Sequence, residues 1–418
     1  MSVFDIIAAV LTLAAVFSYA NYRWIRLPTA IGVMLIALVS SLALAVVGRW
    51  IPGLAEPAKG ILSRIDFNQA LMEGMLSFLL FAGALHINLD DLLRNRYTIL
   101  SLATAGVALS TALIGFGLRF LSQAAGMPLD LKACFLFGAL ISPTDPIAVM
   151  GILRSAGAPK DLEIKIAGES LFNDGVGIVA FLILSEAALE GGAFSIGRAG
   201  VLFLQEALGG AAMGLALGWI AYRMLKSVDN YQVEVLVTLA LVAGGYALAD
   251  ALHCSGPIAT VVAGLLIGNH GRRFAMSART RAHLDMFWEL TDEALNAVLF
   301  VLIGLEALVL DFSARLLLVG AAAIPLALGA RWASVSLPAL LLRRRRPFAP
   351  GAVTMMTWGG LRGGISIALA LSLPAGSLRD ALVSITYMVV VFSILVQGLT
   401  IARVAARVIP TPGSSQEI

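Results

Sequence analysis

Apolar runs long enough to cross a lipid bilayer recur along the whole chain. Charged residues, prolines and glycines interrupt these runs and divide the chain into about thirteen hydrophobic segments. We therefore expect an all-α polytopic membrane protein with about thirteen transmembrane helices. The segments are centred near residues 11, 38, 76, 109, 142, 177, 210, 241, 263, 299, 327, 362 and 391.

The composition agrees with a lipid environment. Only 13% of the residues are charged and 59% are hydrophobic, whereas a soluble chain carries about twice that share of charge. The densest basic run, residues 343–346, is typical of a cytoplasmic loop rather than of a nucleic-acid site. Cys134 and Cys254 have neither the spacing of a metal site nor that of a disulfide framework. We expect membrane lipid as a partner, no nucleic acid and no cofactor.

The basic residues indicate an orientation. With the N-terminus outside, nineteen of the 29 Lys and Arg residues fall in cytoplasmic loops and eight on the opposite side. Positive charge gathers on the cytoplasmic side of membrane proteins. We therefore expect a multi-pass protein of the inner (plasma) membrane with a cytoplasmic C-terminus. A single transmembrane transporter domain is predicted over residues 1–402, followed by a short cytoplasmic tail at 403–418.

Two of the thirteen segments cannot be continuous helices. Residues 142–146 of segment 5 read Ser-Pro-Thr-Asp-Pro, and each proline removes a backbone donor. Segment 12 contains four glycines around Arg362. Irregular backbone at membrane depth persists only where it is buried in protein or lines a wet cavity. Breaks seven segments apart predict two six-helix inverted repeats, segments 1–6 and 8–13, with an ion site where the breaks meet. The alternative is that both breaks are merely structural kinks.

At least six ionisable residues lie near the middle of predicted spans. Each costs about 2.5–3.5 kcal/mol there, even on the mildest insertion scale, and therefore needs a partner or a function. Arg331 is expected to satisfy an acid or free carbonyl groups, with a direct role in transport as the alternative. The six are Glu73, Asp145, Glu169, Asp174, Arg331 and Arg362.

Helical spacing divides the polar residues of segment 6 between two faces. Ser170 and Asp174 share one face, and Glu169 and Asn173 share another, turned by about 100°. The first pair can supply oxygen atoms to a cation. Glu169 can neutralise a buried arginine, and we expect an ion pair with Arg362.

A sodium ion that enters protein exchanges water for oxygen ligands. Asp145 and Asp174 supply carboxylates, Ser170 a hydroxyl, and the unwound backbone at Thr144 a carbonyl group. A buried carboxylate next to another one can also bind a proton near neutral pH when no cation is present. Competition between Na⁺ and H⁺ for the same oxygen atoms then couples their exchange.

Two further acidic features have two interpretations each. Glu73 is either an additional cation ligand or a residue at the level of the lipid headgroups. The acids Glu289, Asp292 and Glu293 open the tenth segment. They either stabilise the positive end of a helix or form a funnel that attracts cations.

Three functions are consistent with these residues, whereas an ion channel would need a continuous pore and suits competing buried carboxylates less well than alternating access. The first is antiport of Na⁺, or Li⁺, against H⁺, and the second is K⁺/H⁺ antiport, because ligand types do not reveal cavity size. The third is an intramembrane aspartyl hydrolase that uses Asp145 and Asp174 as a dyad. The hydrolase leaves the second break unexplained, so we expect a transporter rather than an enzyme.

Taken together, these motifs resemble the monovalent cation:proton antiporters, in particular the NhaP-like branch related to eukaryotic sodium/hydrogen exchangers. The resemblance covers nearly the whole chain, and the order of the motifs makes it specific. It is carried by residues 79–85, 142–146, 168–175, 287–300 and 360–364.

The resemblance implies a homodimer that contributes to pH homeostasis. Segments 3–6 and 10–13 would form a core that moves like an elevator, and the remaining segments would form the dimerisation unit. Asp174 would be the main carrier of cation and proton, Asp145 would line the same cavity, and Ser170 would be a cation ligand. An Asn-Asp pair, here Asn173 and Asp174, goes with electroneutral exchange. Glu73 matches an acidic position that only some members use.

Overall fold

A computed structural model describes residues 3–51, 74–155, 157–189, 196–310, 313–342 and 348–408, together with Glu56, Gly60 and Leu71. Most of these residues are helical, and the described ranges contain no β-strand. Every predicted segment centre lies in one of these helices or in a break between two of them. The helices are α1 (Val3–Ala20), α2 (Thr29–Trp50), α4 (Leu76–Leu85), α5 (Leu89–Ser101), α6 (Val107–Ala124), α7 (Leu131–Ile141), α8 (Ile147–Ser155), α9 (Lys160–Leu189), α10 (Ile196–Lys226), α11 (Tyr231–Ala251), α12 (Gly256–Leu266), α13 (Arg272–Phe274), α14 (Ala278–Glu306), α15 (Ala314–Leu342), α16 (Ala352–Trp358), α17 (Gly364–Leu371), α18 (Ser377–Phe392) and α19 (Gly398–Val408).

Eight helical stretches of the described chain are long and apolar enough to cross a membrane. Two of them contain a π-helical turn that joins two helices. Turn η3 (Leu102–Gly106) connects α5 to α6, and turn η5 (Ser393–Gln397) connects α18 to α19. The all-α membrane fold expected from the sequence is therefore confirmed, whereas the exact number of crossings stays a prediction.

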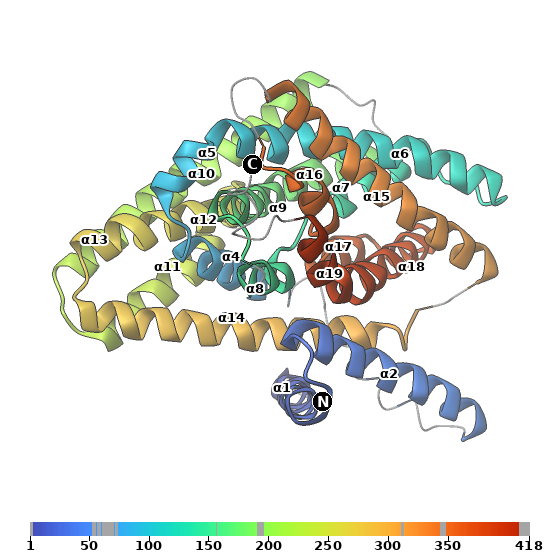
Figure 1. Ribbon diagram of the computed structural model, residues 1–418, viewed down its shortest axis with the longest axis horizontal. Coiled ribbons are helices and arrows are strands. Elements are labelled where there is room, and N and C mark those ends of the chain that lie inside the picture. The colour runs from blue at the N-terminus through green and yellow to red at the C-terminus, as the bar shows by residue number, and fades with distance from the viewer. Residues whose placement is uncertain are drawn as a thin grey trace, which may run out of the picture.

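Both predicted breaks are present. The first separates α7 from α8, and the second separates α16 from α17. They cross each other in an isolated antiparallel bridge, in which the backbone N–H of Asp145 donates to the carbonyl of Leu361 over 2.8 Å. The four half-helices lie near the middle of the view in Figure 1, around α9.

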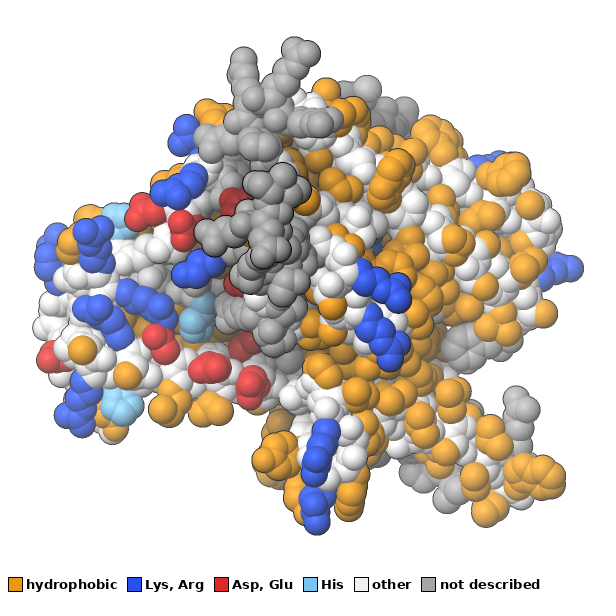
Figure 2. Space-filling view, viewed as in Figure 1, with side chains coloured by type: hydrophobic (Ala, Val, Ile, Leu, Met, Phe, Trp, Pro, Cys, Tyr) orange, Lys and Arg blue, Asp and Glu red, His pale blue; other side chains and the backbone are white. Residues whose placement is uncertain are grey.

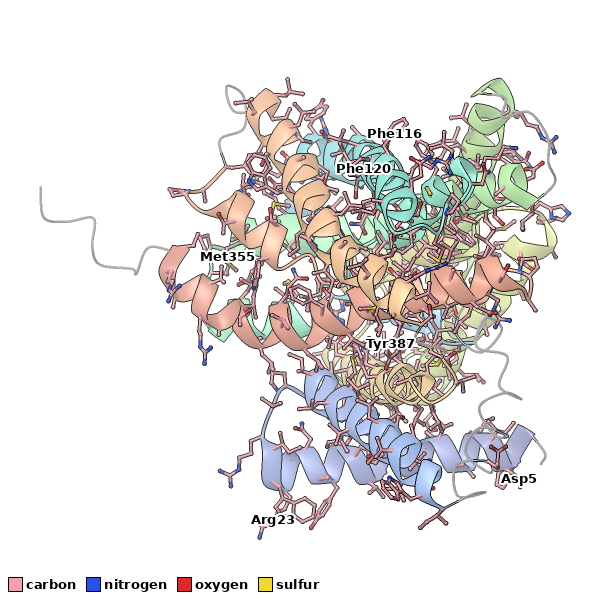
Figure 3. All side chains as sticks on the ribbon, turned by 90° about the vertical axis from the view of Figure 1, so that its right-hand side faces the viewer. Asp5, Arg23, Phe116, Phe120, Met355 and Tyr387 are labelled. Carbon is pink, nitrogen blue, oxygen red and sulfur yellow. The ribbon has the colours of Figure 1, made fainter. Side chains whose placement is uncertain are left out.

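The outer helices enclose this centre. Helices α1 and α2 lie together on one side and pack against α14 (Figures 1 and 3). Phe116 and Phe120 project outward from α6, whereas Met355 and Tyr387 lie inside (Figure 3). Figure 2 shows broad apolar areas on one part of the surface, with charged side chains gathered near α11, α13 and the first half of α14. Exposed apolar surface of this kind suits contact with lipid tails.

The last helix runs to Val408, past the predicted end of the apolar run near residue 402. Arg403 and Arg407 are exposed on it. Residues 409–418, the four-arginine run 343–346 and Glu73 lie outside the described residues.

Glycine allows α7 to approach α6 closely, and this contact holds the start of the first break. A Cβ atom at Gly138 would lie 2.4 Å from the backbone carbonyl oxygen of Thr111. The hydroxyl of Ser142, one turn later, donates to the carbonyl of Gly138 over 2.7 Å and lies 3.0 Å from the hydroxyl of Ser110.

Replacing Gly138 by Ala should therefore destabilise the protein by about 1–3 kcal/mol, because the obstructing atom belongs to the backbone. Gly329→Ala in α15 is the matched control, since its Cβ would meet nothing within 4 Å and alanine favours the helix. Thermal unfolding in detergent, followed by tryptophan fluorescence, compares the two variants. Equal stability would show that α6 and α7 are not in close contact.

Candidate cation-binding site

Asn173 of α9 holds the first break in place. Its amide oxygen accepts from the backbone N–H of Thr144 over 3.3 Å, and its amide nitrogen donates to the Thr144 hydroxyl over 2.9 Å. The same nitrogen donates to Glu169 Oε1 over 3.3 Å, so Glu169 and Asn173 do share a face of α9. Asn173 is completely buried. The Thr144 hydroxyl thus helps to hold the unwound segment.

The other face of α9 carries Ser170 and Asp174. The Ser170 hydroxyl donates to the backbone carbonyl of Thr144. Asp174 is only 7% exposed, and its Oδ1 atom has no hydrogen-bond partner within the described structure. A buried carboxylate oxygen without a donor is costly. A cation or a proton bound at Oδ1 would offset this cost.

Asp145 belongs to the first break and follows Thr144 directly. Its side chain abuts the second break, since a Cβ atom at Gly363 would lie 2.4 Å from Asp145 Oδ2. The charge of Asp145 is close enough to that of Asp174 to repel it. The structure thus brings together Asp145, Asp174, Ser170 and Thr144, four of the five predicted cation-binding residues.

Glu169 forms its ion pair with Arg331 of α15, and the predicted pairing with Arg362 is wrong. Nη1 and Nη2 of Arg331 donate to the two oxygen atoms of Glu169, the second over 2.7 Å. Arg331 also donates to the carbonyl of Met356 through Nε and Nη2, over 3.2 and 3.1 Å. The expectation that Arg331 satisfies an acid or free carbonyls is correct, and it satisfies both. Gly360 leaves room for this guanidinium group, because a Cβ there would lie 2.6 Å from Nε.

Arg362 has a different partner, the end of α7. Its Nη1 donates to the carbonyl groups of Ser142 and Pro143 over 2.6 and 3.0 Å. The last carbonyls of a helix lack intrahelical partners and form its negative end. Pro146 has no N–H to offer Ser142, because its ring nitrogen carries no proton. Arg362 therefore satisfies the Ser142 carbonyl that Pro146 leaves without a donor, together with the neighbouring carbonyl of Pro143.

Turn η5 supplies side chains that sequence reasoning did not identify. The Ser393 hydroxyl accepts from the backbone N–H of Arg362 over 2.9 Å, and Gln397 donates to the carbonyl of Trp358 over 2.9 Å. Both residues satisfy the backbone of the second break. Their polarity within an apolar segment was the available signal, since buried polar side chains need partners.

A family model described as "Sodium/hydrogen exchanger, transmembrane" matches residues 10–407. The chain belongs to the sodium/hydrogen exchanger family. It is 50% identical to the Na⁺/H⁺ antiporter NhaP of Pseudomonas aeruginosa over 97% of this chain and 96% of that one. It is 34% identical to the Na⁺/H⁺ antiporter NhaH of Halobacillus dabanensis over 95% and 96% of the two chains.

The fold also matches a solved member of this group. The sodium proton antiporter MjNhaP1 from Methanocaldococcus jannaschii, determined at pH 8, superposes with a TM-score of 0.74. The match covers 98% of this chain and 99% of that one at 20% sequence identity. The resemblance inferred from the motifs is therefore confirmed at the level of family and fold.

The Glu169–Arg331 pair can be tested with a double-mutant cycle. Glu169→Gln and Arg331→Gln should each destabilise the protein by about 3–5 kcal/mol, because each leaves a buried charge without its partner. The double variant should lose less unfolding free energy than the two single variants lose together. Thermal unfolding in detergent is the measurement.

A second double-mutant cycle, the matched control, combines Glu169→Gln with Arg362→Gln. We expect little coupling between Glu169 and Arg362, since the latter binds carbonyl groups. A larger coupling for Arg362 than for Arg331 would restore the original assignment.

Proposed function

We propose that the protein is a secondary antiporter of the plasma membrane that exchanges Na⁺, or Li⁺, for H⁺. The observation that carries the proposal is the unpartnered, buried Oδ1 atom of Asp174, next to the unwound backbone of the first break. The names of the relatives, which are Na⁺/H⁺ antiporters, support the choice of substrates.

The proposed cation ligands are the carboxylates of Asp174 and Asp145, the hydroxyl of Ser170 and the carbonyl of Thr144. Hard cations prefer such oxygen ligands. The Ser170 proton points to the Thr144 carbonyl, so the hydroxyl lone pairs are directed elsewhere and can coordinate a cation. Glu73 is kept as a further proposed ligand.

Competition at Asp174 makes the exchange obligatory. A proton and a sodium ion bind the same carboxylate oxygen atoms, so either one displaces the other. The scheme keeps the remaining charges of the site fixed: Asp145 holds one protonation state throughout, Arg331 neutralises Glu169, and the neutral amide of Asn173 is bound to Thr144 and Glu169. One carboxylate that carries either H⁺ or Na⁺ has the same net charge in both states. We therefore propose one-for-one, electroneutral exchange.

The moving core, the dimer interface and the orientation in the membrane are also proposals. The core, built from predicted segments 3–6 and 10–13, would carry the loaded Asp174 across the membrane in an elevator-like motion. The remaining segments would form the interface of a homodimer. The N-terminus would lie outside the cell and the C-terminus in the cytoplasm. Such a cycle removes Na⁺ and adjusts internal pH.

Replacing Asp174 by Ala should abolish Na⁺-driven proton movement while leaving the fold intact, because it removes the carboxylate whose buried Oδ1 atom is proposed to carry both ions. Proteoliposomes with an internal pH dye give the rate, and size-exclusion chromatography checks the fold. Asp90→Asn, which removes an exposed charge at the start of α5, is the control and should transport normally. Exchange that persists in Asp174→Ala would disprove the assignment.

The same proteoliposomes compare the two cations. A stronger response to K⁺ than to Na⁺ in the unaltered protein would favour K⁺/H⁺ exchange.

The electroneutral scheme makes two further measurements decisive. Clamping the membrane voltage at different values should not change the exchange rate at equal ion gradients. Calorimetric titration with Na⁺ in buffers of different ionisation enthalpy should show about one proton released per ion bound at neutral pH, following the linkage between binding and protonation. A voltage-dependent rate would contradict electroneutrality, and the absence of proton release would contradict competition.

A further inference from the structure

Helix α14 carries a polar stripe that leads toward the two breaks. Glu289, Asp292, Glu293 and Asn296 recur at intervals of three and four residues, so they lie along one side of the helix. Glu289 and Glu293 are exposed, Asp292 is half-buried and Asn296 is 5% exposed. Acidic side chains line the α14 edge of the surface in Figure 2. The stripe therefore passes from the surface into the interior.

The helix dipole does not explain this stripe. Acidic residues stabilise a helix within its first turn, but α14 begins at Ala278. Asp292 is roughly four turns further along, at 3.6 residues per turn. The interpretation of these acids as an N-terminal feature is wrong, because the helix extends well ahead of the apolar segment.

Asn296 is the inner end of the stripe, and its amide is unsatisfied. Its amide approaches the carboxylate of Asp292, but neither its oxygen nor its nitrogen forms a hydrogen bond of normal geometry within the described chain. A buried amide without partners destabilises the folded state, so it needs a ligand to offset that cost. Asp292, one turn earlier on the same side, is the nearest acidic residue of the stripe.

The stripe ends next to the cation-binding site. Leu299, three residues beyond Asn296, contacts the second break, since a Cβ atom at Gly364 would lie 2.5 Å from its side chain. The neighbouring Gly363 abuts the carboxylate of Asp145. The charge of Asp292 is also close enough to that of Asp145 to repel it. Asp292 and Asn296 thus lie between the surface and Asp145.

We propose that Asp292 and Asn296 form an outer binding station for the transported monovalent cation. The inference rests on the proposed function. The Asp292 carboxylate attracts the ion and raises its local concentration, and the Asn296 carbonyl oxygen replaces part of its water shell. The ion then moves to Asp145 and Asp174. The predicted orientation places the first half of α14 at the cytoplasmic side, so the station serves the cation that enters from the cytoplasm.

The test compares Asp292→Asn and Asn296→Leu with Glu289→Gln, which removes a charge from the exposed part of the same stripe. Oriented proteoliposomes give the exchange rate against Na⁺ concentration on each side in turn. Both station variants should raise KM for Na⁺ on the cytoplasmic side by roughly five- to tenfold, the effect of losing one ligand. KM on the other side and the maximal rate should change less than about twofold, and Glu289→Gln should leave both KM values near normal.

Stability separates a ligand from a structural residue. Asn296→Leu removes an unsatisfied buried amide, so its thermal unfolding temperature should equal or exceed that of the unaltered protein. A lower unfolding temperature would overturn the proposal, because the amide would then have a structural partner. An unchanged cytoplasmic KM, or an equal increase on both sides, would overturn it too. Asp174→Ala tests the proposed function separately: if that variant is inactive while the station variants keep a normal KM, only the station is disproved.

Discussion

The structure depends on how two unwound segments satisfy their backbone inside a membrane protein. Lipid offers neither donors nor acceptors, so every free N–H and carbonyl group of a broken helix needs a partner from the protein. The bridge between Asp145 and Leu361 joins the breaks directly. Asn173 takes the N–H of Thr144, Arg362 takes the carbonyls at the end of α7, and turn η5 serves the second break. The Oδ1 atom of Asp174 is a buried oxygen that this arrangement leaves without a donor within the described residues.

The ionisable residues near the breaks therefore have unequal roles, although the sequence places them all in apolar segments. Glu169 and Arg331 neutralise each other, and Arg362 neutralises helix carbonyls. Their charges are held by several hydrogen bonds and cannot easily follow an ion. Asp174 keeps an oxygen atom without a donor. Within this group, Asp174 is therefore the residue whose charge can be neutralised by an arriving ion or proton.

Segments and breaks could be predicted from the sequence because each depends on local chemistry. Apolar length predicts a helix in lipid, and Pro143, Pro146 and the glycines around Arg362 predict its interruption. Spacing also placed Ser170 and Asp174 on one face of α9, with Glu169 and Asn173 on another. The partner of Glu169 could not be predicted in this way, because it depends on which helix packs beside α9. Two buried arginines were available, and only the tertiary arrangement selects Arg331. A carbonyl group without a donor is also a possible partner for a buried arginine. Pro146 removes the N–H donor of the Ser142 carbonyl at the end of α7, so the sequence did offer this partner for Arg362.

The contrast between Asn173 and Asn296 extends this argument beyond the breaks. Both are buried amides on long helices, yet the first binds Thr144 and Glu169, whereas the second only approaches Asp292 and forms no hydrogen bond of normal geometry within the described residues. A satisfied amide stiffens the site, because moving it would break several hydrogen bonds at once. An unsatisfied amide next to Asp292 costs stability in the empty protein and recovers that cost when an ion arrives. The fold thus separates residues that hold the site from residues that receive the ion, and the difference lies in hydrogen bonding rather than in residue type.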